Sequence, residues 1–142
     1  VVVFPFREIN RNAKGSGLGE ALSEMLITSI ANQEYLTVIE RSQIDKVIEE
    51  HSFQLSGVTD EEKSVKIGNI LNAEILILGS VSRFGERIEL DVRVINGETG
   101  EILLTRYGSS NEDGLREMVN ELGTEISEAS YDTVIRRRPV DG

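Results

Sequence analysis

The sequence predicts a single α/β domain (α+β in some schemes), with helices packed on one mixed sheet of about five strands. Its 142 residues fit one domain, and 39% hydrophobic with 28% charged residues is ordinary for a globular protein. In the first half, helical and strand patterns alternate, as parallel strands joined by crossover helices require. In the second half, three strand patterns separated by short turns indicate an antiparallel meander. The predicted order is β-α-β-α-α-β-β-β-α.

The first half begins with a strand, a loop and a helix. "VVVFPF" (1–6) predicts a buried strand because it is β-branched and apolar on both faces, and Pro5 suits a strand end or a sheet edge. A polar loop over 7–17 follows. Apolar residues at helical spacing then predict an amphipathic helix over 17–32, and "YLTVIE" (35–40) predicts a second strand.

Two capping signals predict two further helices. Each pairs a Ser or Thr with an acidic residue three positions later, an arrangement that satisfies free amides of the first helical turn. The first helix is expected over about 42–52, and the second from Thr59 to about Leu71, after which Asn72 suits the left-handed position that closes a helix. The paired residues are Ser42 with Asp45, and Thr59 with Glu62.

The second half predicts three consecutive strands. "EILILGSVSRF" (74–84) is the longest apolar strand pattern, and "EILLTRYG" (101–108) follows the turn "NGETG". Between them, "RIELDVRVI" (87–95) alternates apolar and polar residues, so one face of this strand is expected to be wet. The polar positions are Glu89, Asp91 and Arg93.

A long helix is expected over 111–135, because five apolar residues lie on one stripe. Acidic residues at its start and the "RRR" run at 136–138 both suit the helix dipole. We therefore expect one domain over 1–135 and a basic tail over 136–142. The residues of the stripe are Leu115, Met118, Val119, Leu122 and Ile126.

The run "GSGLGE" (15–20) raises the question of a phosphate site. A dinucleotide fingerprint needs its first glycine at the end of the strand, whereas Gly15 comes nine positions after Phe6. Glu20 stands where the third glycine belongs, and no Lys-Ser or Lys-Thr pair follows as in a P-loop. We interpret the run as a flexible loop that leads into a helix, with no bound cofactor.

The composition excludes several kinds of chemistry. A net charge of −10 opposes contact with phosphate backbones, so nucleic acid is not an expected partner. The absence of Cys excludes thiolate zinc sites, and the single histidine, His51, cannot form a His-based metal site alone. No apolar run approaches the ~18 residues of a spanning helix. We expect no catalytic, cofactor-binding or metal site, and a protein that is not an enzyme.

The stretch "LGEALSEMLITSIANQEYLTVIERSQIDKVIEE" (18–50) resembles the soluble domain of the CsgG family, the curli production assembly and transport component. The resemblance continues through 51–85 and 94–105 and covers about 1–130. It implies an envelope protein, usually a periplasmic lipoprotein tethered to the outer membrane, that acts through protein contacts. Relatives implied by the resemblance include activators of penicillin-binding proteins (the LpoB type) and the amino-terminal domain of TolB-like proteins.

One departure from the family bears on function. The curli channel crosses the membrane with two long β-hairpins, whereas the expected hairpin turns here, "FGER" (84–87) and "NGETG" (96–100), are short and polar. The leading hypothesis is therefore a soluble assembly factor, adaptor or activator that binds an envelope protein. The alternative is an oligomeric subunit of a curli-type secretion channel whose membrane hairpins are absent here. A third hypothesis is a nucleotide or small-anion binder at residues 15–20.

The chain begins at Val1 inside a strand pattern, so we expect a processed or trimmed fragment with any signal peptide or lipid anchor upstream. Contact with a membrane is expected only through such an anchor. Loops and the wet strand face are the expected partner surface. Arg41 and Ser42 are expected to be structural, as an ion-pair partner and a helix cap. The candidate partner residues are Glu89, Asp91, Arg93, Asn12, Lys14 and Gln54.

Overall fold

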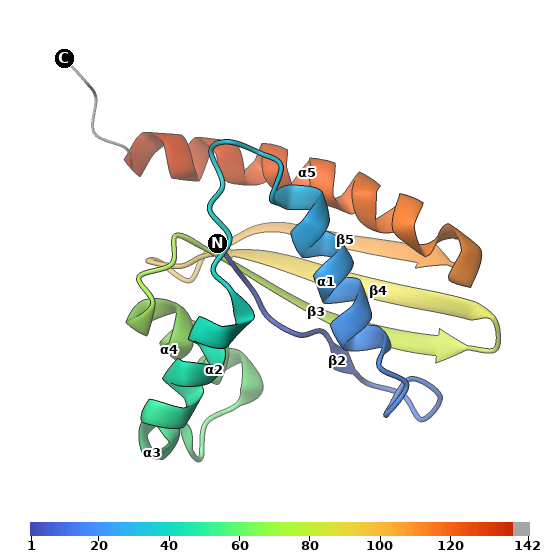
Figure 1. The fold of residues 1–142 in the computed structure, drawn as a ribbon, viewed down its shortest axis with the longest axis horizontal. Helices are drawn as coiled ribbons and strands as arrows, with labels where there is room; N and C mark the ends of the chain where they lie inside the picture. Colours follow the sequence, from blue (N-terminus) through green and yellow to red (C-terminus); the bar gives the residue numbers. More distant parts are fainter. Residues whose placement is uncertain (138–142) are drawn as a thin grey trace.

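The computed structural model describes residues 1–137 and confirms the predicted fold class, a mixed five-stranded sheet with helices packed against it (Figure 1). A short 3₁₀ turn, Glu112–Gly114, precedes the last helix. The elements, in order, are β1 (Val2–Val3), β2 (Arg7–Glu8), α1 (Leu18–Ile30), α2 (Arg41–Glu50), α3 (Ser52–Leu55), α4 (Asp60–Ile70), β3 (Ile75–Phe84), β4 (Arg87–Asn96), β5 (Ile102–Ser110) and α5 (Leu115–Arg137).

The sheet has the strand order β1-β3-β4-β5, and β2 also pairs with β3. β1 and β2 run parallel to β3, with Val2 opposite Leu76 and Arg7 opposite Ser80. The remaining strands form the predicted antiparallel meander. The turn between β3 and β4 is tight, because Phe84 pairs directly with Arg87.

Two expected strands differ from the prediction. Residues 1–6 do not form one strand: β1 ends at Val3, and β2 begins after Pro5, which has no amide hydrogen to donate to a ladder. Residues 35–40 do not form a strand: Tyr35 belongs to a turn, and 36–40 have no regular secondary structure. Two backbone hydrogen bonds, both 2.8 Å, join Thr37 and Ile39 to Val1. β1 is only two residues long, so the pairing goes no further.

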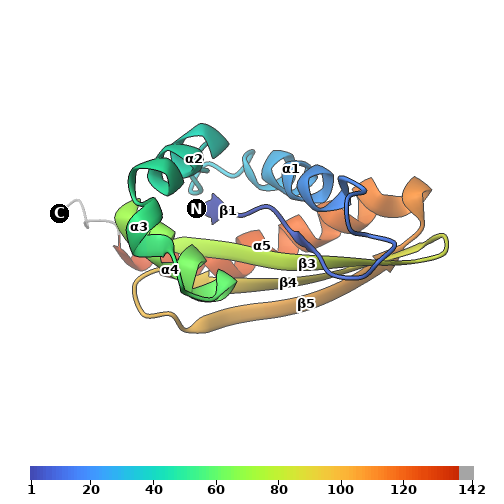
Figure 2. The ribbon, with the colours of Figure 1, turned by 90° about the horizontal axis from the view of Figure 1, so that it is seen from below.

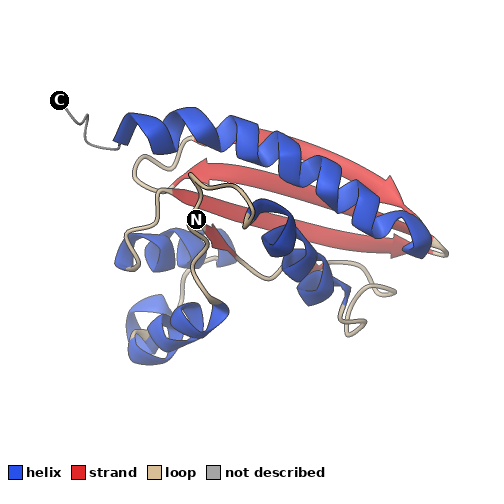
Figure 3. Ribbon diagram, turned by 45° about the horizontal axis from the view of Figure 1, so that its top comes forward, coloured by secondary structure: helices blue, strands red, loops and turns tan. Residues whose placement is uncertain are grey.

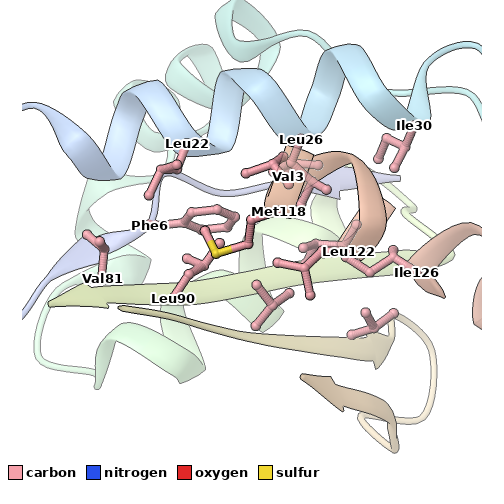
Figure 4. Close-up of a cluster of buried hydrophobic side chains, with 14 of the residues drawn as sticks. Val3, Phe6, Leu22, Leu26, Ile30, Val81, Leu90, Met118, Leu122 and Ile126 are labelled. Carbon is pink, nitrogen blue, oxygen red and sulfur yellow. The ribbon is translucent and has the colours of Figure 1, made fainter. Parts of the chain in front are cut away.

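The larger core lies between one face of the sheet and the helices α1 and α5 (Figures 3 and 4). Figure 4 shows side chains from both helices in contact with those of β1, β3 and β4, with Phe6 and Met118 near the centre of the cluster. Gly123 lets the two helices approach, since a Cβ there would collide with Ser29. All five stripe residues of α5 are buried, as predicted: Leu115, Met118, Val119, Leu122 and Ile126.

A smaller core covers only one end of the opposite face. There α2, α3 and α4 pack on Leu76 and Ile95, which lie opposite each other on β3 and β4 (Figure 2). Ile44 of α2, Leu55 of α3 and Ile67 of α4 supply the covering side chains. The sheet therefore has one fully covered face and one that is covered at a single end.

The capping predictions had mixed outcomes. Thr59 and Glu62 form the expected capping box at the start of α4, and Asn72 closes that helix at φ 54°. The box expected at Ser42 was wrong: α2 begins one residue earlier, at Arg41, and no side chain caps its first turn. Ser42 therefore lies inside the helix, where its hydroxyl cannot act as the cap. α5 runs to Arg137, and residues 138–142 of the expected basic tail lie outside the described part.

Candidate functional site

The uncovered part of the sheet forms one wall of a groove of about 1080 Å³. The first turns of α4 form the facing wall, with Asp60, Glu61 and Lys63. Phe4 and Pro5, which follow β1, also line the groove. The sheet wall comes from the central part of β3, β4 and β5. A second hollow, beside Val1 and Tyr35, is much smaller, at about 210 Å³.

The polarity of the sheet wall follows from the strand registers. Side chains alternate between faces along a strand, so residues paired across strands share a face. Under the small core this face begins with the apolar pair Leu76 and Ile95. Farther along, the same face carries Ser80 and Asp91, followed across the sheet by Tyr107 of β5. The face thus changes from apolar and covered to polar and open.

Ion pairs cross the groove from the sheet to α4. Arg93 of β4 pairs with Glu61 at 3.2 Å, and Arg7 of β2 pairs with Asp60 at 3.6 Å. All four side chains are well exposed, so each pair contributes at most about 1 kcal/mol. These pairs can therefore open at little cost when another group competes for them.

The two carboxylates of this strand face differ in their partners. Glu89 accepts a hydrogen bond from the Tyr107 hydroxyl at 2.9 Å and pairs with Arg87 at 2.8 Å. Asp91 is exposed and makes no side-chain hydrogen bond or ion pair within residues 1–137. It is therefore an acceptor in the wall of the groove that is free to meet a partner.

The structure brings together three of the six predicted partner residues. Glu89, Asp91 and Arg93 share the open face of β4, and the latter two line the groove. The other three lie elsewhere: one loop before α1 holds Asn12 and Lys14, and α3 holds Gln54, at opposite ends of the molecule (Figure 1). The sequence reasoning missed Ser80 and Tyr107, because their strands lack a clear alternation of polar and apolar residues.

The glycine-rich loop holds an anion that belongs to the chain itself. The carboxylate of Glu8 accepts hydrogen bonds from the backbone amides of Gly15 at 2.9 Å and Gly19 at 3.0 Å, and from the Ser16 hydroxyl at 3.3 Å. The amide of Gly19 has the largest effect and lowers the pKa of this carboxyl; partial burial opposes it, and hydrogen bonds from Gly15, Ser16 and Gly17 lower the pKa further. A phosphate at this loop would have to displace Glu8.

Other predicted side chains have structural partners. Arg41 reaches back to α1, where it pairs with Glu20 at 3.5 Å and Glu24 at 3.4 Å, as expected for an ion-pair partner. In the described part of the chain, no group of three or more His, Cys, Asp or Glu could hold a metal ion. No helix among residues 1–137 combines the length and the apolar character needed to cross a membrane.

Comparisons with known proteins add a family and a set of similar folds. The model of the family described as "Curli production assembly/transport component CsgG" matches residues 4–89, more than half of the chain. A search of curated protein sequences gave no match.

Among solved structures, the LpoB C-terminal domain from Salmonella enterica has a TM-score of 0.60 at 17% identity, covering 78% of this chain and 81% of that one. Lipoprotein GNA1162 from Neisseria meningitidis has a TM-score of 0.57 at 16% identity, covering 89% and 96%. A PelC dodecamer from Paraburkholderia phytofirmans has a TM-score of 0.55 at 11% identity, covering 90% and 86%. At these identities the likeness concerns the fold.

Proposed function

The chain belongs to the CsgG family, and on that premise we propose that it is a non-catalytic protein-binding module of the bacterial cell envelope. In this proposal it is a periplasmic domain, tethered to the outer membrane by a lipid anchor upstream of Val1. It acts as an assembly factor, adaptor or activator of another envelope protein. The family membership supports the compartment, and the lipoprotein with a similar fold is consistent with the anchor.

The observation that carries the binding role is the groove beside the open sheet face. An uncovered sheet face in a compact domain is ordinarily polar throughout. The open face of this sheet instead has charged side chains next to apolar ones. Leu78 and Ile48 give the groove an apolar side, while Asp91 and Arg93 give it charge that can fix the orientation of a partner. Tyr107, 57% exposed, adds an aromatic side chain of the type enriched at binding hot spots.

The ion pairs of the groove suggest how a partner is accommodated. Glu61 and Arg93 already satisfy each other, so the unbound surface does not leave strong charges unpaired. A partner that presents a basic group to Asp91 gains an ion pair without breaking an existing one. The loop that carries Asn12 and Lys14 and the short helix that carries Gln54 lie outside the groove. We propose them as secondary contacts only for a partner large enough to extend past its ends.

A photo-crosslinking experiment tests this proposal. A photoreactive amino acid at position 91 is expected to capture a specific envelope protein, and the same amino acid at Glu49, exposed on α2, is not. The captured protein is then purified and its affinity for the chain measured. Asp91→Lys should weaken binding by about tenfold or more, the effect of losing ~1.4 kcal/mol, while Glu49→Lys should leave it unchanged. Equal affinity of both variants would contradict a binding role for the groove.

A second candidate function is a subunit of a ring-shaped envelope assembly. It is favoured by one observation, the similar fold found in a PelC dodecamer, together with the transport description of the family. Mass photometry of the full-length protein in detergent distinguishes the two. A ring subunit gives a discrete high-mass species that persists on dilution, whereas an adaptor remains monomeric until its partner is added.

A further inference from the structure

We propose that the outer edge of β5 binds an extended, basic segment of a partner protein, which adds to the sheet as a sixth strand. The proposal rests on the proposed function in one respect, that the chain acts by binding another polypeptide. It concerns the sheet edge and not the cavity, and it names the chemistry of the partner. Three features of the edge support this pairing: it is open, acidic side chains flank it, and the spacing of these side chains fits a strand.

β5 is a terminal strand of the sheet and pairs only with β4 among the described residues. Proteins usually protect such edges with proline, lysine, bulges or very short strands, because unpaired amides and carbonyls attract other strands. β5 is nine residues long and contains neither Pro nor Lys. A register irregularity lies near its start, opposite Val94 and Ile95, and leaves Leu104–Ser110 regular. Seven residues of edge are thus available for pairing.

One side chain covers part of this edge. Arg106 donates from Nη1 to its neighbouring carbonyl, that of Thr105, at 2.9 Å, and from Nε to Glu125 of α5 at 2.6 Å. The Arg106 side chain is about half exposed, at 46%. Arg106 thus donates to one carbonyl of the edge and to one carboxylate of α5. An added basic strand would make the same two kinds of contact along the rest of the edge.

Acidic side chains flank the edge on the helix side. α5 runs along β5 (Figure 3), and the pair between Arg106 and Glu125 fixes which side of the helix borders the strand. Residues at i−4, i+3 and i+7 from Glu125 lie on the same side of a helix. All three are acidic and exposed, and no described residue forms an ion pair with them: Glu121, Glu128 and Asp132.

The spacing of this acidic row matches an added strand. Its members rise by about 5.5 Å on average along the helix axis, from 1.5 Å per residue. Side chains on one face of a strand repeat every ~6.8 Å. Lysine or arginine at alternate positions of an added strand would therefore each meet about one carboxylate of this row. A second copy of this chain fits poorly, because it would bring a second acidic row and another net charge of −10 to the same edge.

Synthetic peptides test the proposal on the intact protein. An eight-residue peptide of alternating lysine and valine is the probe, and an equivalent peptide of glutamate and valine is the charge control. A third peptide keeps the lysines but is N-methylated at alternate backbone amides, which removes strand pairing and leaves the charge. The readout is hydrogen exchange of the β5 amides together with affinity at low salt.

The lysine peptide is expected to bind and to slow exchange of amides within Leu104–Ser110, whereas neither other peptide does. Reversing two charges of the row, Glu121→Lys with Glu128→Lys, should weaken binding by about fivefold, as expected for two exposed ion pairs. The matched reversal on α2, Asp45→Lys with Glu49→Lys, should have a much smaller effect. Equal binding of the N-methylated peptide, or no slowing of exchange in β5, overturns the proposal. Neither result affects the outcome of the crosslinking test at Asp91. The sheet-edge proposal and the groove proposal can therefore be refuted independently of each other.

Discussion

Replacing Glu8 by Gln tests the idea that the chain supplies its own anion to the glycine-rich loop. Glu8 lies at the end of β2, and its two carboxylate oxygens together accept from Gly15, Ser16 and Gly19. A glutamine keeps one acceptor oxygen, but its NH₂ group replaces the other. This NH₂ group cannot accept hydrogen bonds from the N–H and O–H donors of the loop. At least one backbone amide at the start of α1 then loses its partner.

The size of the effect follows from these contacts. Loss of a carboxylate or hydroxyl cap at a helix start usually costs about 0.5–2 kcal/mol. Glu8 is partly exposed, so water can replace some of the lost hydrogen bonds. We therefore expect the free energy of unfolding to fall by about 1–2 kcal/mol at pH 7. For a domain of this size that corresponds to a fall in Tm of about 3–8 °C.

The pH dependence gives the sharper test, because its sign is fixed. Hydrogen bonds to the ionised form, from Gly19 above all, hold the pKa of Glu8 in the folded protein below its ordinary value of 4.5. Stability from this group is therefore complete above about pH 4.5 and is lost as the pH falls through the lower, folded pKa. Urea unfolding at several pH values should show a constant difference between the wild type and Glu8→Gln at neutral pH, which shrinks toward zero in acid.

A matched control uses the same substitution where no partner exists. Glu86 lies in the exposed turn between β3 and β4 and forms no ion pair or side-chain hydrogen bond within residues 1–137. Glu86→Gln should leave stability nearly unchanged at every pH. If Glu8→Gln behaves in the same way, the carboxylate does not organise the loop, and the loop becomes available for an external anion.

Four further substitutions test the architecture, each by chemical denaturation and each against the wild type. Thr59→Ala should cost about 1 kcal/mol because it removes the cap of α4, whereas Ser42→Ala should cost almost nothing, since the hydroxyl caps no helix; equal losses would show that the caps are misassigned. Leu122→Ala opens a cavity in the larger core and should cost about 2–5 kcal/mol, and a loss below 1 kcal/mol would mean that α5 packs elsewhere. Gly19→Ala should destabilise by several kcal/mol or prevent folding, because its Cβ would collide with the carbonyl of Phe6, and a stable variant would refute this close approach.

The sequence predicted those parts of the fold whose signals are local. The apolar stripe of α5, the capping box at Thr59 and the left-handed position at Asn72 are each determined within one or two helical turns. The alternation in β4 likewise predicted that Asp91 and Arg93 lie on an open face. Such patterns survive folding because the side chains responsible are neighbours in the chain.

What the sequence could not predict depends on distant contacts. Residues 35–40 have a strand composition, but the backbone hydrogen bonds of Thr37 and Ile39 go to Val1, which precedes the two-residue strand β1, so no ladder extends. The groove needs α4 to lie opposite Tyr107, which comes from a strand more than thirty residues later in the chain. The sequence places Glu8 in a polar loop and does not predict its role, because that role requires the glycine amides to converge on its carboxylate. These relations exist only in the folded chain.

The pairing of β1 with β3 constrains how the protein is made. Val2 lies opposite Leu76, so the first strand must wait for a partner 74 residues farther along the chain. At a synthesis rate of ~5–20 residues per second, this wait lasts roughly four to fifteen seconds on the ribosome. During that interval the apolar "VVVFPF" segment is available to chaperones and export factors. Nascent chains arrested before residue 75 should therefore be cut by protease within this segment, and resistance at that length would show that it docks earlier by another route.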